Sequence, residues 1–267
     1  MRLAFFLNGD RGEAVLSALV EQPEHAIVRV VRGRQDVNGR AFVADLAETK
    51  PDLLVVAGYP TIFKRPLLSV ARLGVVNLHA GRLPQYRGGS PLNWQMINGE
   101  SVAGFAVLQM DEGIDTGAVW ISSQLPIGPR ETIMELHARA NRLFPPLTLE
   151  ALAMIAAGCQ PTPQDAAQAC YWHQRSRADG RLDFARSTAA EADRFIRALT
   201  GSYGGAWCHR DGAEVKLWRA RVPERVIRGN PGRVCRIERA GPYVVCADRA
   251  ILIEEYEGTL RHGDVLG

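Results

Sequence analysis

Residues 77–91 read NLHAGRLPQYRGGSP and follow the apolar run GVV, so Asn77 and His79 close a predicted buried strand. The two residues are two positions apart on that strand and therefore point to the same face. Two prolines and three glycines lie within the quoted stretch, which is more than a simple turn needs. This arrangement predicts a polar site at the end of a strand, beside a loop that is shaped to hold a ligand.

The region around this stretch alternates apolar runs with helical patterns. The runs predicted as strands cover residues 3–7, 26–31, 53–58, 74–79, 103–110 and 118–127, and the helical patterns cover 14–21, about 41–49 and 92–99. Such alternation predicts an α/β fold with a Rossmann-like, mostly parallel sheet and right-handed crossovers. The last two strands flank DEGIDTG and are expected to form a hairpin at the sheet edge. Ligands bind beyond the carboxyl ends of strands in such sheets, which is where Asn77 and His79 lie.

One long helix is predicted over residues 131–157, with an irregularity at Pro145-Pro146. After it the alternation of strands and helices ends. A Pro-, Gln- and Arg-rich segment follows, which indicates a linker that lies over the surface. Thr188 and Glu191 then have the spacing of a capping box before a helix. Five short β-like runs close the chain and suggest a small barrel of the oligonucleotide/oligosaccharide-binding (OB) type. The predicted segments are a Rossmann-like domain at 1–160, a linker with a connecting helix at 161–204, and an OB-like β domain at 205–267.

Composition limits the class of protein. Hydrophobic residues make up 46% of the 267 residues and charged residues 23%, as in ordinary globular proteins, and the net charge of +3 is too small to require a nucleic-acid partner. Five cysteines without a CxxC pair indicate neither a disulfide framework nor a zinc site, so no metal is expected. The start MRLAFFLNGD has too short an apolar run for a signal peptide, and no run is long enough to span a membrane. These features predict a soluble, cytoplasmic protein.

Asp115, in the DEGIDTG turn, is the third residue of a candidate site. A loop that leaves the neighbouring strand can bring its carboxylate beside the imidazole of His79. An Asn donor, a His that takes or gives a proton and a nearby carboxylate can perform acyl transfer without a covalent nucleophile. Asn77 and protonated His79 would donate to the oxyanion, and Asp115 would hold the imidazole protonated or order a water that relays a proton. Taken singly, an Asn-x-His pair is more often a turn with a satisfied histidine, and DEGIDTG is more often a plain hairpin loop.

In combination, NLHAGRLPQYRGGSP and the later GFAVLQMDEGIDTG resemble the formyltransferases that take a one-carbon unit from 10-formyltetrahydrofolate. The pieces that carry the resemblance are Asn77, His79, Leu83-Pro84, Arg87-Gly88 and the segment QMDEGIDTG with Asp115, in the family's order and separation. The resemblance implies the formyltransferase fold for the first domain, 10-formyltetrahydrofolate as cosubstrate, and Asn77, His79 and Asp115 as the catalytic trio.

The resemblance also implies where the folate and the acceptor bind. Loops around Leu83-Pro84 and Asp111–Ile114 are expected to hold the pterin largely through backbone groups, with Tyr59–Phe63 as a further wall. For Ile62 and Phe63 a core-packing role is an equal alternative. The expected folate-binding residues are Tyr59, Ile62, Phe63, Leu83, Pro84, Asp111, Glu112, Gly113 and Ile114. The expected acceptor-binding residues are Tyr86, Arg87, Gly88 and Trp94.

The acceptor amine is predicted from departures from the family pattern. Family acceptors include methionyl-tRNA, glycinamide ribonucleotide, amino sugars on nucleotides and hydroxyornithine-type amines, and QMDEGIDTG resembles the tRNA and sugar enzymes. Only 76 residues precede Asn77, however, and RGRQDVNGR is a brief basic segment where the tRNA enzymes carry a longer insertion. Because a tRNA reader needs many phosphate contacts, we expect a smaller acceptor: a nucleotide-linked amino sugar of surface-polysaccharide or lipopolysaccharide biosynthesis.

Other features leave alternatives open. The range Arg219 to Arg239 holds seven arginines against two glutamates and fits a solvated barrel surface, an RNA-binding ribbon or a diphosphate site. Trp94, Trp207 and Trp218 are candidates for stacking on a base. The runner-up functions are methionyl-tRNA formyltransferase, with tRNA as partner, and a formyltransferase for another small amine. A non-catalytic folate- or nucleotide-binding protein is a third hypothesis, which the catalytic trio argues against. Sugar-modifying relatives suggest a homodimer.

Overall fold

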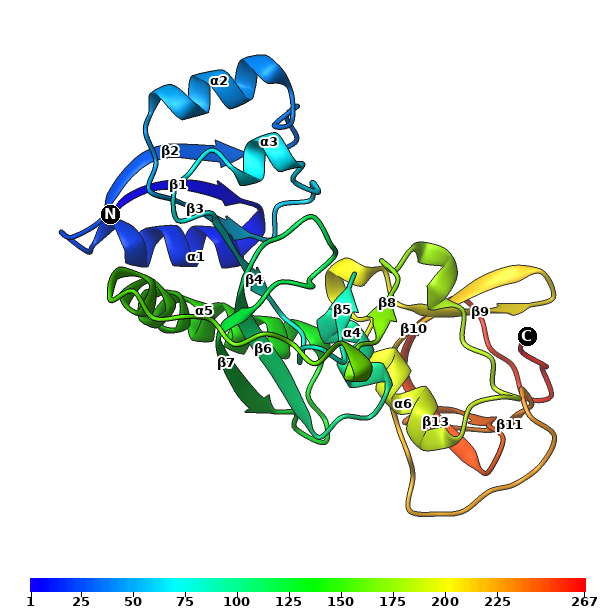
Figure 1. Cartoon of the computed structure of the whole chain (residues 1–267). Coiled ribbons are helices and arrows are strands. Elements are labelled where there is room, and N and C mark those ends of the chain that lie inside the picture. Colours follow the sequence, from blue (N-terminus) through cyan, green and yellow to red (C-terminus); the bar gives the residue numbers. More distant parts are fainter. The chain divides into compact units, whose positions relative to one another are not determined.

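The first half of the chain forms a six-stranded sheet in the computed structural model, which describes residues 1–267 (Figure 1). The parallel strands are β1 (Arg2–Leu7), β2 (Ala26–Arg32), β3 (Leu53–Ala57) and β4 (Val75–His79). β6 (Val102–Gln109) and β7 (Val119–Pro126) form an antiparallel hairpin, giving the order β2-β1-β3-β4-β6-β7. The predicted mostly parallel sheet with a hairpin at its edge is therefore confirmed.

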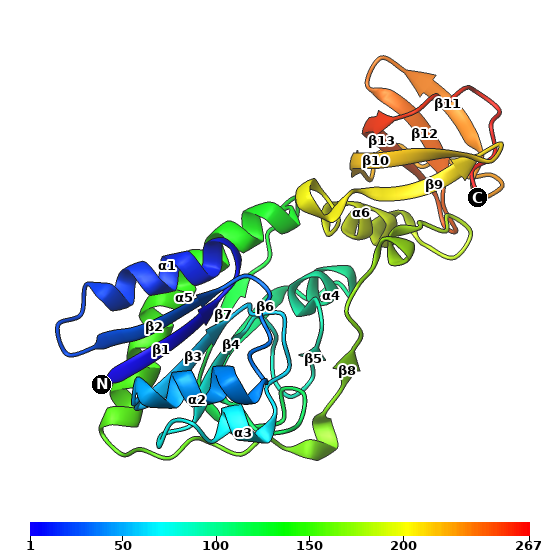
Figure 2. The same ribbon diagram turned by 90° about the horizontal axis from the view of Figure 1, so that it is seen from above.

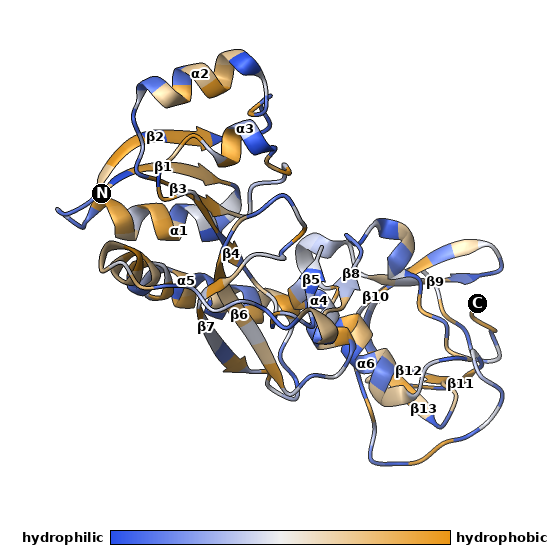
Figure 3. Cartoon of the chain, in the orientation of Figure 1, coloured by the Kyte–Doolittle hydropathy of each residue, from blue (hydrophilic) through white to orange (hydrophobic).

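Helices cover both faces of this sheet, as Figure 1 and Figure 2 agree. α1 (Gly9–Val20) and the His137–Ala156 part of α5 (Ile133–Ala156) lie on one face, and α2 (Arg40–Glu48) and the short α3 (Arg65–Leu68) lie on the other. α5 runs continuously through Pro145 and Pro146. Every residue of β3 is buried, and the central strands are correspondingly apolar in Figure 3. Burial on both faces explains why these strands are continuous apolar runs rather than alternating ones.

The chain divides into two compact units. The first unit comprises Met1–Pro91, Val102–Pro126 and His137–His173, and the second comprises Leu92–Ser101, Ile127–Leu136 and Gln174–Gly267. Two internal stretches, one of them containing most of α4 (Pro91–Ile97), thus belong with the C-terminal part of the chain. The domain boundaries expected at residues 160 and 204 stay a prediction.

The second unit contains a five-stranded antiparallel sheet of order β11-β12-β13-β10-β9. Its strands are β9 (Ala206–Arg210), β10 (Ala213–Arg221), β11 (Val234–Glu238), β12 (Gly241–Val245) and β13 (Ala250–Glu257). The predicted small C-terminal β domain is confirmed, but the sheet does not close into a barrel. Its edge strands are instead linked through the end of the chain, where Leu266 pairs with Arg210 and Val265 with Arg233. These pairings protect edges that would otherwise be open to other strands.

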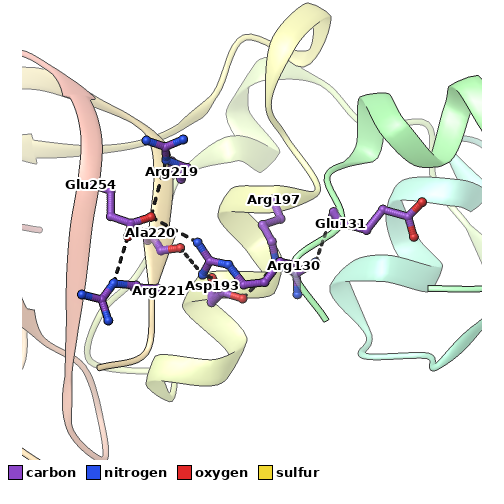
Figure 4. Close-up of polar contacts among 8 residues, drawn as sticks. All are labelled: Arg130, Glu131, Asp193, Arg197, Arg219, Ala220, Arg221 and Glu254. Carbon is purple, nitrogen blue, oxygen red and sulfur yellow. Dashed lines mark hydrogen bonds and ion pairs between the residues drawn. The ribbon is translucent and has the colours of Figure 1, made fainter. Parts of the chain in front are cut away.

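α6 (Ala189–Arg197) packs on this sheet and begins with the predicted capping box. Figure 4 shows how the stretch Ile127–Leu136 is joined to it within the second unit. Arg130 donates to the carbonyl oxygen of Ala220 at 2.8 Å and to the Glu254 carboxylate at 3.1 Å. Arg197 donates to Asp193 at 2.8 Å and to the carbonyl oxygen of Glu131 at 2.6 Å.

The Pro- and Gln-rich segment after α5 makes specific contacts within the first unit, to which its residues up to His173 belong. Thr162 pairs with Val119 at the start of β7. β8 (Tyr171–Trp172) pairs in parallel with β5 (Arg87–Gly88), which lies in the loop that follows β4. The segment therefore reaches the neighbourhood of Asn77 and His79 rather than only covering the surface. No helix of the structure combines the length and the apolarity needed to cross a membrane.

Candidate active site

His79 ends β4 between β3 and β6, with only 5% of its surface exposed. Its Nε2 lies 2.6 Å from the carbonyl oxygen of Tyr86. Because a carbonyl oxygen can only accept a hydrogen bond, Nε2 carries a hydrogen and donates it. The other ring nitrogen, Nδ1, lies 3.5 Å from the Oδ2 atom of Asp115. Nδ1 is therefore the nitrogen that can exchange a proton at this site.

Asp115 lies in the loop between β6 and β7 and has a left-handed backbone with φ of 52°. Its Oδ2 accepts the backbone N–H of Gly88 at 2.9 Å, which orients the carboxylate beside the imidazole. Asp111 shapes the same loop by accepting the N–H of Gly113 at 3.0 Å and the hydroxyl of Thr116. The structure thus brings together His79 and Asp115, as the sequence predicted, while their catalytic roles stay a proposal.

Asn77 lies two residues before His79 on β4 and is half-buried. Alternation along a strand places its side chain on the same face as that of His79. Its amide makes no hydrogen bond within the protein, so its donors are available to a ligand. The face that carries an unpaired amide and a proton-exchanging imidazole can stabilise a negative oxygen.

Two glycines of the quoted loop permit close contacts. A Cβ atom at Gly81 would lie 2.4 Å from His79 Nε2 and 2.6 Å from the Tyr86 oxygen. Gly88 has φ of 94°, and a Cβ there would lie 2.3 Å from the carbonyl oxygen of Trp172. The glycine content of this loop therefore follows from the approach of its backbone to His79 and to β8.

The residues expected to bind folate differ in exposure. Phe63 and Tyr59 are buried and pack edge-on against Phe6, with ring centroids at 4.9 Å and 5.6 Å, and burial raises the pKa of the Tyr59 hydroxyl. Ile62 and Ile114 are exposed at 67% and 51%. Glu112 and Gly113 are exposed as well. For Phe63 the core-packing alternative describes its contacts, and the folate-binding roles of the whole set stay a proposal.

Leu83 and Pro84 line a cavity of about 730 Å³ beneath their loop. The other walls come from β6, β7 and residues 162–165, whereas Asn77, His79 and Asp115 do not line it. The cavity is therefore distinct from the space between the imidazole and the Asp115 carboxylate.

The residues expected to bind the acceptor are held by other parts of the protein. The ring of Tyr86 stacks on Trp172 at 5.6 Å, and Arg87 is buried at 4% exposure. Trp94 belongs to the second unit, where the guanidinium of Arg175 lies 4.8 Å from its ring centre. Their roles in acceptor binding stay a prediction.

Gln164 is a site residue that the sequence reasoning missed. Its side-chain nitrogen donates to the carbonyl oxygens of Asp115 at 2.8 Å and Gly117 at 2.7 Å. It stands in a segment predicted as a linker, and a glutamine among prolines and alanines gave no signal of this contact. The structure contains no group of three or more His, Cys, Asp or Glu side chains that could hold a metal ion.

Comparisons with known proteins place the chain in a family. Residues 1–152 match the Formyl transferase family and residues 175–259 match the Formyl transferase C-terminal domain. The chain is 35% identical over 216 residues to the methionyl-tRNA formyltransferase of Geobacter sulfurreducens, covering 80% of this chain and 67% of that protein. It is 36% identical over 240 residues to the methionyl-tRNA formyltransferase of Acidobacterium capsulatum, covering 89% of this chain and 76% of that protein.

Solved structures share the fold at lower sequence identity. WlaRD, a sugar 3N-formyl transferase, superposes with a TM-score of 0.74 at 15% identity, covering 97% of this chain and 99% of that one. HypX from Aquifex aeolicus in complex with tetrahydrofolic acid superposes with a TM-score of 0.72 at 23% identity, covering 96% of this chain and 44% of that one.

The fold, the arrangement of His79 and Asp115, and the matches over both parts of the chain define a folate-dependent transferase of one-carbon groups. The chain belongs to the formyl transferase family. It is a 10-formyltetrahydrofolate-dependent N-formyltransferase, as the sequence predicted.

The prediction of a nucleotide-linked amino sugar as acceptor was wrong. The relatives that are 33% to 36% identical over most of this chain are named methionyl-tRNA formyltransferase, and they favour the runner-up. The mistaken argument relied on a short basic segment between β2 and β3. Surface loops tolerate insertions and deletions while the scaffold is retained, so the length of that segment does not determine the acceptor.

Proposed function

We propose that this protein transfers the formyl group of 10-formyltetrahydrofolate to the α-amino group of methionyl-tRNA. The observation that supports methionyl-tRNA as the acceptor is the 35% identity to a methionyl-tRNA formyltransferase over 80% of the chain. The geometry of His79 and Asp115 supports the chemistry, since it provides a proton-exchanging nitrogen 3.5 Å from a carboxylate.

In the proposed reaction the neutral amine attacks the formyl carbon, and the C–N bond to N10 of the folate then breaks. Asn77 and the Nδ1–H of His79 donate to the oxygen that becomes negative in the tetrahedral intermediate. The Asp115 carboxylate, with its Oδ2 atom 3.5 Å from Nδ1, holds the imidazole in place beside that charge. The proton lost by the attacking amine is returned to N10, so that tetrahydrofolate leaves as a neutral amine.

The proposed folate site lies around the loops that carry Ile62 and Ile114. Ile62 and Ile114 are exposed at 67% and 51%, so both side chains are accessible to a ligand. The backbone of Asp111–Ile114 would supply the polar contacts to the pterin.

Each unit carries exposed arginines without a carboxylate partner that would contact tRNA phosphates. In the first unit Arg34 lies between β2 and α2 and Arg40 is the first residue of α2, and in the second unit Arg228 and Arg239 lie on either side of β11. Arg219 and Arg221, in contrast, are engaged by Glu254. The RNA-binding interpretation of the Arg219–Arg239 range therefore depends on arginines without a carboxylate partner, such as Arg228 and Arg239.

The test is incubation of the purified protein with 10-formyltetrahydrofolate and charged initiator methionyl-tRNA, with mass spectrometry of the released amino acid. We expect formyl-methionine, and no product from free methionine. The rate at subsaturating tRNA should fall steeply between about 50 and 200 mM salt, because each phosphate contact releases counterions. A His79→Ala protein serves as the inactive control. Absence of formyl-methionine from a protein that binds tetrahydrofolate would refute the proposed acceptor.

A further inference from the structure

The Asp115 backbone is held by a residue outside its own loop. Gln164 donates one amide hydrogen to the Asp115 carbonyl oxygen at 2.8 Å and the other to that of Gly117 at 2.7 Å. Asp115 has φ of 52°, a conformation that non-glycine residues rarely adopt. Such a conformation persists only where surrounding contacts impose it. Gln164 supplies two of those contacts.

The orientation of the Gln164 amide is itself fixed. Its Oε1 atom accepts from Nε of Arg87 at 3.1 Å and from Nη2 of the same guanidinium at 2.9 Å. Arg87 is 4% exposed, and its Nη1 donates to the Tyr171 hydroxyl at 2.9 Å. Because a guanidinium only donates, the amide oxygen must face it and the NH₂ group must face the two carbonyls. All the hydrogen-bonding capacity of the Gln164 side chain is used.

The loop that contains Arg87 also holds the side chain of Asp115. Gly88, next to Arg87, donates its N–H to the Asp115 carboxylate at 2.9 Å. Arg87 and Gly88 pair with Tyr171 and Trp172 in the small β5–β8 sheet. Gly88 thus holds the carboxylate of Asp115, and Arg87 holds its backbone through Gln164.

We propose that Gln164 is a positioning residue for formyl transfer. It fixes the Asp115 backbone so that the carboxylate stays beside Nδ1 of His79. Arg87 supports it by holding the amide oxygen. This inference rests on the proposed role of Asp115 in the reaction.

The test uses Gln164→Glu, which has the same shape and keeps the acceptor for Arg87. The variant replaces the NH₂ group by an oxygen that faces two carbonyl oxygens, so the Asp115 loop must move. We expect kcat to fall about 100-fold, as a small misplacement near the chemistry can produce. Gln160→Glu is the matched control, because Gln160 is exposed and contacts only the carbonyl oxygen of Gly158 in its own segment. It should retain wild-type kcat.

A second measurement does not depend on the acceptor. The imidazole ¹⁵N chemical shifts of His79 should change in Gln164→Glu as they do in Asp115→Asn, and should not change in Gln160→Glu. Circular dichroism and cooperative urea unfolding report whether the variant is folded, and Gln164→Ala replaces it if it is not. Wild-type His79 shifts in a folded variant, or wild-type kcat, would overturn the proposal. A wild-type protein that does not formylate methionyl-tRNA would refute the proposed acceptor alone, since the shifts still test Gln164.

Discussion

The imidazole Nε2 of His79 donates to the carbonyl oxygen of Tyr86 across 2.6 Å, and the backbone of Gly81 passes directly beside that bond. The bond leaves Nδ1 as the nitrogen that faces Asp115. The loop after β4 therefore determines which nitrogen of the imidazole can take part in proton exchange.

Gly81→Ala should disable the site without unfolding the protein. The added Cβ would lie 2.4 Å from Nε2 and 2.6 Å from the Tyr86 oxygen, closer than carbon atoms approach such groups, so imidazole and carbonyl must separate. We expect kcat to fall about 100-fold, measured as formyl release from 10-formyltetrahydrofolate. Gly229→Ala is the control, because its Cβ would meet only Val245 at an ordinary 3.6 Å. Equal rates for the two variants would count against the importance of the His79–Tyr86 bond.

Much of this arrangement could be predicted from the sequence. Asn77 and His79 follow a continuous apolar run, and strand periodicity alone places them on one face. Asp115 could be assigned to the site because it stands in a glycine-containing turn between two predicted strands of the same sheet. The hairpin and the capping box at Thr188 were likewise predictable from local patterns.

The contacts that complete the site were not predictable from local patterns. Gln164 is far from Asp115 in sequence, and a single hydrogen-bonding side chain leaves no periodic signal. Barrel closure also failed as a prediction, because short β-like runs do not reveal whether the edge strands pair with each other or with the chain end. The acceptor depends on surface loops, whose length varies independently of the core.

Asp115→Asn tests the carboxylate itself. The amide oxygen can still accept the N–H of Gly88, but the neutral group no longer stabilises a protonated His79. We expect kcat to fall between about 100- and 10,000-fold, the range for loss of a positioned acid–base group. Tetrahydrofolate affinity, measured by calorimetry, should be unchanged. Asp45→Asn, which alters an exposed ion pair with Arg29, is the control and should be fully active.

His137 should make the protein sensitive to acid. Burial, with a smaller contribution from the Arg11 guanidinium, lowers the pKa of His137 from 6.5 to about 4. Between pH 6.5 and 4 the unfolded chain binds a proton that the folded chain excludes, so the free energy of unfolding falls as the pH falls. The total loss is about 3 kcal/mol, and it is absent above pH 6.5.

Urea unfolding of wild type and His137→Gln at several pH values measures this dependence. Glutamine does not titrate, so the variant should lose about 3 kcal/mol less than wild type over this interval. His262→Gln removes an exposed histidine and should follow the wild-type curve. Parallel curves for wild type and His137→Gln would show that His137 is not buried in its neutral form.

Asp193→Ala should destabilise the second unit. Asp193 and Arg197 are one turn apart on α6, their side chains are 11% and 8% exposed, and Nε of Arg197 lies 2.8 Å from the carboxylate (Figure 4). Removing the carboxylate leaves a buried guanidinium without its counter-charge and costs about 3 kcal/mol. Glu255→Ala is the matched control, because its ion pair with Arg219 is exposed and contributes less than about 1 kcal/mol. Chemical unfolding followed by the fluorescence of Trp207 and Trp218, with the other tryptophans replaced by phenylalanine, measures both variants. If the two substitutions had equal effects, the pair on α6 would be accessible to water.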